Sequence, residues 1–257
     1  MVWFMGIDIG SRTSKGVITT DGELSASHLL PSGVNYRTAA QMLREKLLAE
    51  AGLQEKDIAC TVTTGNGDGI IPFSDRHVAD ISCCARGING VSPSVRTVID
   101  VQGQSTQAIR LNQYGEVTDF AINEICASGS GYFLEVIANV LQVDLADIGP
   151  LSLRSNNPVT FTTGCAVFGE SEAISRVAEG IPKEDILAGV HKALAGRIHA
   201  LVEKVGMEEP CAISGGGGLN IGLISKIEEL GLELIVPAQP HYVNAFGAAI
   251  IAENMDV

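Results

Sequence analysis

Two segments of the chain repeat one pattern of apolar runs and turns. Residues 4–30 read FMGIDIGSRTSKGVITTDGELSASHLL, and residues 97–122 read TVIDVQGQSTQAIRLNQYGEVTDFAI. Each begins with an apolar run ending in Ile-Asp, passes through a turn of small and hydroxyl residues, and adds two further apolar runs around a second turn. Asp8 and Asp100 are 92 positions apart, and the second-turn glycines Gly22 and Gly115 are 93 apart. This agreement predicts duplicated halves, each opening with a three-strand meander.

After each meander the apolar residues follow the 3.6-residue period of helices. Ala39, Leu43, Leu47 and Ala51 mark one helix, which we expect to end at Gly52. The other expected elements are a strand at 58–62, helices at 78–87, 132–141, 170–179 and 186–205, a strand at 211–214, and then a Gly-rich turn, two helices and a strand at 232–236. Mixed sheets flanked by helices make the fold class α/β. We expect the halves, residues 1–95 and 96–257, to pack tightly around a cleft.

The first turn of the repeat has the composition of a phosphate-binding turn. Gly10 lets the backbone approach an anion, while N–H and hydroxyl groups and one lysine offer donors to phosphate oxygens. Asp8 lies too near a bound phosphate to face it directly, so a Mg²⁺ between them is expected. The candidate nucleotide-binding residues of this turn are Gly10, Ser11, Arg12, Thr13, Ser14 and Lys15.

Two more turns extend this interpretation. The second copy of the repeat offers Asp100, Gly103 and Gln104, so that the two turns would act as a clamp. The third turn, SGGGG at 214–218, follows a strand and precedes a helix, and four consecutive glycines are costly unless a ligand approaches the backbone. Together the turns resemble those of the actin and hexokinase superfamily, which implies ribonuclease H-like halves around an ATP cleft, an adenosine turn at Gly215, Gly216 and Gly217, and a final helix at 244–249. Asp8, Asp100 and Gln104 are the candidate catalytic residues.

Two of the six cysteines stand immediately before amphipathic helices. Cys126 and Cys165 are each followed by small residues, which leave room for inorganic sulfide, and a helix N-terminus favours a thiolate. Two thiolates per chain cannot hold a [4Fe–4S] cluster, which needs four, but a two-fold dimer would supply them. The remaining cysteines, Cys60, Cys83, Cys84 and Cys211, fall in apolar strands or a helix and are interpreted as structural.

The chain resembles, over nearly its whole length, the ATP-dependent activators of 2-hydroxyacyl-CoA dehydratases and the ATPase subunits of benzoyl-CoA reductase. The specific segments are GIDIGSRTSKG, the N-x-x-C-A-[SA]-G-[ST]-G-x-F-L-E block at 123–135, and C-x-V-F-x-E-S-E at 165–172. The resemblance implies one [4Fe–4S] cluster held by Cys126 and Cys165 of two subunits, in a homodimer or a paralogous heterodimer. It also implies that ATP hydrolysis drives a low-potential electron into a partner iron–sulfur dehydratase or reductase of CoA esters. The CASGSG segment looks closer to the reductase subunits.

Two positions depart from the activator pattern. The activators read Gly-Gly-Gln-Asp in the second phosphate turn, whereas this chain has Ser105 in place of the aspartate. Loss of that carboxylate would weaken the positioning of Mg²⁺ or water. His241 stands where the activators carry a glutamine near the adenine, a change that affects base packing more than chemistry.

Charge and composition exclude two classes of partner. The 257-residue chain has a net charge of −13, which argues against nucleic acid, because phosphate backbones require clustered Lys and Arg. No apolar run reaches the roughly 18 residues of a membrane helix, and we expect a cytoplasmic protein.

Two other function classes fit the same fold. A small-molecule kinase would need a catalytic aspartate over the γ-phosphate, and the cysteine pair would then have no role. A nucleotide-binding partner without hydrolysis is consistent with the departure at Ser105.

Overall fold

The computed structural model describes residues 1–123, 130–161 and 166–255. The chain forms two compact units. The first contains residues 1–96, 111–118 and 237–257, and the second contains residues 97–110 and 119–236. The predicted division at residue 95 was based on the repeat in the sequence. The two units are defined by contacts in the structure, and on that basis residues 237–257 belong to the first unit.

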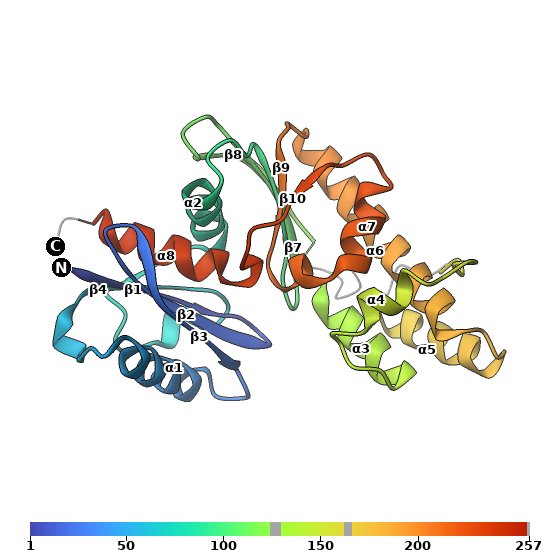
Figure 1. The fold of residues 1–257 in the computed structure, drawn as a ribbon, viewed down its shortest axis with the longest axis horizontal. Coiled ribbons are helices and arrows are strands. Elements are labelled where there is room, and N and C mark those ends of the chain that lie inside the picture. The colour runs from blue at the N-terminus through green and yellow to red at the C-terminus, as the bar shows by residue number, and fades with distance from the viewer. Residues whose placement is uncertain (124–129, 162–165, 256–257) are drawn as a thin grey trace. The chain divides into compact units, whose positions relative to one another are not determined.

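The first unit contains a five-stranded sheet in the order β3-β2-β1-β4-β5 (Figure 1). The central strand β1 is antiparallel to β2 and parallel to β4, and β4 is parallel to β5. The strands are β1 (Trp3–Ile9), β2 (Thr13–Thr20), β3 (Glu23–Pro31), β4 (Ile58–Thr64) and β5 (Arg76–His77).

The second unit contains a sheet of the same topology, in the order β10-β9-β6-β7-β8. Its central strand β6 is antiparallel to β7 and parallel to β9, and β9 is parallel to β10. The strands are β6 (Thr97–Val101), β7 (Thr106–Leu111), β8 (Val117–Ile122), β9 (Cys211–Ser214) and β10 (Leu234–Ile235). The strand order is the same in both sheets, and so are the directions of the central strand against its two neighbours and of the outer parallel pair, which confirms the predicted duplication and the α/β fold class.

The helices follow the predicted positions closely, except that the short helix α4 was not predicted. Those of the first unit are α1 (Tyr36–Ala51), α2 (Asp80–Val91) and α8 (Val243–Glu253), and those of the second are α3 (Gly131–Leu141), α4 (Ile148–Ser152), α5 (Ala166–Ala178), α6 (Lys183–Val205) and α7 (Ile221–Glu228). One expectation is wrong: a single α-helix, α7, separates the Gly-rich turn from β10, and α8 follows that strand. Residues 220–233, between the Gly-rich turn and β10, hold one α-helix of eight residues and the turns that lead to the strand.

Residues of β1 alternate between the two faces of the first sheet, as strand geometry requires. Met5, Ile7 and Ile9 are buried against α1, on one face of the sheet (Figure 1). Gly6 faces α8, where a Cβ would overlap the Ala245 carbonyl oxygen. Asp8 follows Gly6 on that same face. The alternation therefore carries a carboxylate to the end of the central strand, beside a closely packed helix.

Candidate functional site

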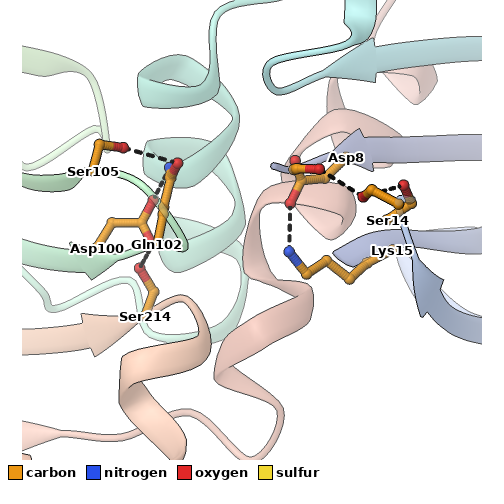
Figure 2. Close-up of polar contacts among 9 residues, drawn as sticks. Asp8, Ser14, Lys15, Asp100, Gln102, Ser105 and Ser214 are labelled. Atoms are coloured by element: carbon orange, nitrogen blue, oxygen red, sulfur yellow. Dashed lines mark hydrogen bonds and ion pairs between the residues drawn. The ribbon is translucent and has the colours of Figure 1, made fainter. Parts of the chain in front are cut away.

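The first phosphate turn is built around Asp8, the penultimate residue of β1. Lys15 Nζ on β2 forms an ion pair with the Asp8 carboxylate over 3.3 Å (Figure 2). The Asp8 side chain is 10% exposed and the Lys15 side chain is 14% exposed. The strand register explains the pairing, because Asp8 lies directly opposite Lys15 in the antiparallel ladder. Gly10, Ser11 and Arg12 form the turn between these two strands. The structure therefore brings the predicted carboxylate and cation together.

Ser14 and the segment after β3 brace this turn. Ser32 Oγ donates to the Gly10 carbonyl oxygen over 2.6 Å, and Ser32 N–H donates to the Arg12 carbonyl oxygen. The Ser14 hydroxyl lies 2.8 Å from Ser32 Oγ and donates to it, since the Ser32 proton is already used. Ser14 is fully buried. Its side chain thus holds the turn from beneath, and a phosphate contact by this hydroxyl stays a prediction.

Asp8 carries its charge in an unfavourable environment. Burial raises the pKa of Asp8 above the ordinary aspartate value; Lys15 opposes this shift, and Asp80 at the start of α2 adds to it. Thr64 lies opposite Asp8 in the parallel ladder with β4, and its Oγ1 is buried without a hydrogen-bond partner among the described residues. A buried carboxylate and an unpaired hydroxyl side by side are the oxygen donors that a hydrated Mg²⁺ requires.

The second turn is organised by Asp100, which is fully buried on β6. Ser214 Oγ donates to Asp100 Oδ1 over 3.0 Å, and Gln102 Nε2 donates to Oδ2 over 2.7 Å (Figure 2). Ser105 Oγ in turn donates to Gln102 Oε1 over 3.2 Å, which fixes the orientation of the amide. Ser105, the departure from the activator pattern, therefore has a structural role. Gly103 and Gln104 complete the turn, and Gln104 is exposed.

The two halves share a second turn that sequence reasoning missed in the first half. Gly215 follows β9 with φ +75°, and Gly65 follows β4 with φ +90°. A Cβ on Gly215 would lie 2.7 Å from Asp100 Oδ1, and one on Gly65 would lie 2.5 Å from Asp8 Oδ1. The segment TGNG at 64–67 is thus the counterpart of SGGG at 214–217. Its signal was a Gly-x-Gly pair directly after a predicted strand.

The Gly-rich turn leaves one position open to a ligand. A Cβ on Gly217 would overlap Val101, so packing explains that glycine. Gly216 is exposed, and a Cβ there would meet nothing within 4 Å. Packing gives no reason for glycine at this position, whereas close approach of a ligand would.

His241 lies in the short helix Pro240–Tyr242 of the first unit. Burial lowers its pKa, and the nearby charge of Lys15 lowers it further. Its Nδ1 is buried without a hydrogen-bond partner among the described residues. Because the charge of Lys15 affects the pKa of His241, the imidazole lies near the first phosphate turn. A contact between His241 and adenine stays a prediction.

Both predicted cluster ligands, Cys126 and Cys165, lie outside the described residues. The four described cysteines, Cys60, Cys83, Cys84 and Cys211, are free and buried. Burial raises the pKa of Cys60 and raises that of Cys211 to about 12, so neither favours a thiolate. Within the described ranges, no three His, Cys, Asp or Glu side chains gather as a metal site. No helix in those ranges is long and apolar enough to cross a bilayer.

The second phosphate turn is hydrogen-bonded to the beginning of α3. Gly131 N–H donates to the Gln102 carbonyl oxygen and Tyr132 N–H to the Gly103 carbonyl oxygen, each over 2.8 Å. Asn123 N–H donates to the Thr106 carbonyl oxygen over 2.9 Å. The described residues Asn123, Gly131 and Tyr132 are therefore joined by hydrogen bonds to this turn or to β7, the strand that follows it.

Similarity to known proteins extends over nearly the whole chain. Residues 5–252 match the model of the BadF/BadG/BcrA/BcrD ATPase family. The chain is 38% identical to the 2-hydroxyisocaproyl-CoA dehydratase activator of Clostridioides difficile, covering 98% of this chain and 95% of the relative. It is 36% identical to one of the benzoyl-CoA reductase subunits of Thauera aromatica, covering 95% and 91%. Overall identity thus does not favour the reductase subunits.

Solved structures extend the comparison to the fold. The Clostridium difficile 2-hydroxyisocaproyl-CoA dehydratase activator with bound ADPNP superposes with a TM-score of 0.94 at 38% identity, covering 98% of this chain and 94% of that one. A glucokinase of the ROK family from Streptomyces griseus has a TM-score of 0.58 at 14% identity, covering 98% and 100%, and shows the common fold alone. The chain therefore has the actin-like ATPase fold.

The two aspartates should respond differently to loss of charge. Asp100→Asn should lower the free energy of unfolding by about 1–3 kcal/mol, because the amide places a donor against the Ser214 or Gln102 donor. Asp8→Asn should change it by less than about 1 kcal/mol, since relief of the buried charge offsets the lost Lys15 pair. Urea titration followed by circular dichroism measures both. Equal losses would contradict the different roles of the two carboxylates.

Proposed function

Because the chain belongs to the BadF/BadG/BcrA/BcrD ATPase family, we propose that it hydrolyses ATP to deliver low-potential electrons to a partner iron–sulfur enzyme that dehydrates or reduces a CoA ester. The observation that carries the ATPase part is the duplicated turn, with a buried carboxylate at the end of the central strand in each half. The relatives named as a dehydratase activator and a component of a reductase support the class of partner.

In this proposal the first turn binds the phosphates and Mg²⁺. Asp8 would hold the ion, with Thr64 Oγ1 as a further oxygen donor, and the ion would neutralise charge on the phosphates. Lys15 supplies a second positive charge at the same turn. N–H groups of Gly10 to Thr13 are the expected donors to phosphate oxygens.

The second turn and the Gly-rich turn would complete nucleotide binding. Ser214 and Gln102 each donate to one oxygen of Asp100, so this carboxylate would hold the turn in shape, and a direct catalytic role for it stays a prediction. Gln104, exposed in that turn, is the residue that would orient the attacking water. Gly215, Gly216 and Gly217 would let the adenosine part approach the backbone. The kinase alternative has support from the fold only.

Cys126 and Cys165 would hold the [4Fe–4S] cluster together with the same residues of a second copy. They are the cysteines that remain after the four buried ones, and they precede α3 and α5, two helices that pack against each other. When bound, such a cluster supplies one-electron transfer.

Helix α5 offers a surface for that second copy. Of its residues 168–178, only Gly169 and Ala173 are buried, while the apolar side chains of Phe168, Ile174 and Val177 are 67%, 53% and 45% exposed. Exposed apolar side chains of this size are typical of an interaction surface. A two-fold dimer is the common arrangement that would cover them.

Hydrolysis would act on the cysteine segments through the second turn. The Gly131 and Tyr132 N–H groups donate to that turn, so a shift of its carbonyl oxygens on loss of the γ-phosphate changes the position of α3. Such coupling works only as far as ATP and ADP bind the two arrangements unequally.

Removal of the Asp8 charge should strongly reduce ATP hydrolysis. Asp8→Asn should lower Mg²⁺-dependent ATP hydrolysis by about 100-fold or more, since electrostatic effects dominate phosphoryl transfer. Asp21→Asn is the matched control, because Asp21 is an exposed aspartate in the turn after β2 and should keep full activity. Wild-type protein that binds neither ATP nor ADP in anaerobic calorimetry would contradict the proposal at its first step.

Iron content should depend on two cysteines and be independent of the others. Cys126→Ser and Cys165→Ser should each abolish bound iron in anaerobically purified protein, whereas Cys60→Ser and Cys211→Ser should retain it. Iron analysis should give about two atoms per chain, because four are shared by two subunits. About four per chain would rule out a shared cluster.

The effect of the bound nucleotide on iron removal should depend on the hydrogen bond donated by Gly131 N–H. In the wild type, bathophenanthroline should remove iron at clearly different rates with ADP and with a non-hydrolysable ATP analogue. Gly131→Pro removes the N–H donor at the first helical position, where proline is tolerated, and Ser130 already has a β conformation with φ −135° and ψ 172°. This variant should lose most of the difference between the two rates.

Gly131→Ala is the control, because it keeps the N–H group and should keep the nucleotide dependence. Nucleotide-independent rates in the wild type would leave the coupling without support. A Gly131→Pro variant that responds to nucleotide as the wild type does would show that the signal takes another route.

A further inference from the structure

A chain of buried polar groups lies behind the Gly-rich turn of the second unit. His191 of α6 is fully buried. Its Nδ1 lies 2.8 Å from Ser152 Oγ, at the end of α4, and its Nε2 lies 2.9 Å from Asn220 Nδ2, between the turn and α7. Three helices are thus joined at the residue where the turn ends.

The hydrogen-bond partners define the direction of every bond in this chain. Ser152 Oγ donates to the Gly149 carbonyl oxygen over 3.0 Å, so its oxygen accepts from His191 Nδ1–H. Asn220 Oδ1 accepts from the Gly222 and Leu223 N–H groups and caps α7, so Asn220 Nδ2–H donates to His191 Nε2. His191 is therefore neutral, with its proton on Nδ1.

Two glycines make room for these contacts. A Cβ on Gly222 would overlap Ser152 Oγ and lie 2.8 Å from His191 Nδ1. A Cβ on Gly149 would lie 2.9 Å from Asn220 Oδ1. The polar groups are packed as tightly as the glycines permit. A network of this kind, with each group satisfied, rigidifies the elements it joins.

The network continues into the turn itself. Asn220 N–H donates to the Gly217 carbonyl oxygen over 3.0 Å, and Gly218 N–H donates to the Gly215 carbonyl oxygen over 3.2 Å. The side chain of Asn220 has no freedom to rotate while His191 accepts its amide proton. The position of Asn220 therefore fixes the C-terminal end of the Gly215–Leu219 segment.

We propose that His191 is a positioning residue for the nucleotide: by accepting from Asn220, it holds the Gly-rich turn in the conformation that receives the adenosine part of ATP or ADP. This inference rests on the proposed function, and it assigns a role to a histidine that has no exposed surface. His191 acts on the ligand through Asn220 and the turn.

The charge state of His191 suits this role. Burial, with a smaller effect from Lys226 on α7, lowers the pKa of His191 to about 4. The lone pair on Nε2 is therefore available to Asn220 throughout the neutral range. A protonated ring would place an N–H group against the Asn220 amide donor.

Two substitutions at His191 separate the two halves of the network. In His191→Gln, the Oε1 atom can replace Nε2 and accept from Asn220, but the Ser152 contact is lost. In His191→Asn, the shorter amide can still reach Ser152, but nothing accepts from Asn220. Both variants should be less stable than the wild type. Calorimetry should show ADP affinity within about threefold of the wild type for Gln and about tenfold weaker for Asn.

Inorganic pyrophosphate, measured on the same proteins, tests whether the effect concerns the adenosine part. Its affinity should be equal in the wild type and both variants, because the phosphate turns are unchanged. A wild-type protein that binds no ADP would refute the proposed function. Wild-type binding with equal ADP affinities for His191→Gln and His191→Asn would overturn the present inference and leave the proposed function intact.

A double-mutant cycle tests the route through Asn220. Asn220→Ser keeps an oxygen to cap α7 but removes the amide donor, so it should weaken ADP binding about as much as His191→Asn. The double variant should bind ADP no more weakly than either single variant, whereas additive losses would contradict action through Asn220. If His191→Asn does not fold, Asn220→Ser alone decides, and unchanged ADP affinity in that variant would overturn the inference.

Discussion

A buried aspartate at the end of the central strand is the constraint on which each half of this protein depends. Asp8 and Asp100 occupy equivalent positions in two sheets of identical topology, each between an antiparallel and a parallel neighbour. A carboxylate is costly to bury unless its oxygens are matched by donors or by a cation. The surrounding turns, a glycine with positive φ, and the bracing hydroxyl groups follow from that requirement.

The two halves stabilise their buried carboxylates in different ways. Asp100 is satisfied by Ser214 and Gln102, so its turn is complete without a ligand. Asp8 has one ion pair with Lys15, a raised pKa, and an unpaired Thr64 hydroxyl beside it. Under the proposed function, an Mg²⁺–phosphate group would complete the first turn, whereas the second turn is already joined by hydrogen bonds to Ser214 and to the start of α3. The two halves therefore share one backbone topology but differ in the side chains that surround the buried aspartate.

Every strand except the two-residue β5, most helices and the residues of three turns were predicted from the sequence, because these depend on local periodicity and on glycine. The sequence did not predict the turn at Gly65, since a single Gly-x-Gly pair is weak evidence until the sheet brings it against Asp8. The hydrogen bond between the Ser14 hydroxyl and Ser32 was not predictable either, because the two residues are distant in sequence, and the phosphate contact of Ser14 stays a prediction. His191 lacked any ligand spacing, and its partners Ser152 and Asn220 become neighbours only through helix packing.

The second phosphate turn and the Gly-rich turn are each joined to a helix N-terminus by hydrogen bonds. At the second phosphate turn, N–H groups at the start of α3 donate to turn carbonyl oxygens, and at the Gly-rich turn Asn220 caps α7 while donating to His191. Helix N-termini carry unpaired donors, so a turn that satisfies them is mechanically joined to the whole helix. A nucleotide that alters such a turn must move a helix or break a hydrogen bond. Under the proposed function, movement of α3 would be the relevant response, because this helix follows the segment that contains Cys126 in the sequence.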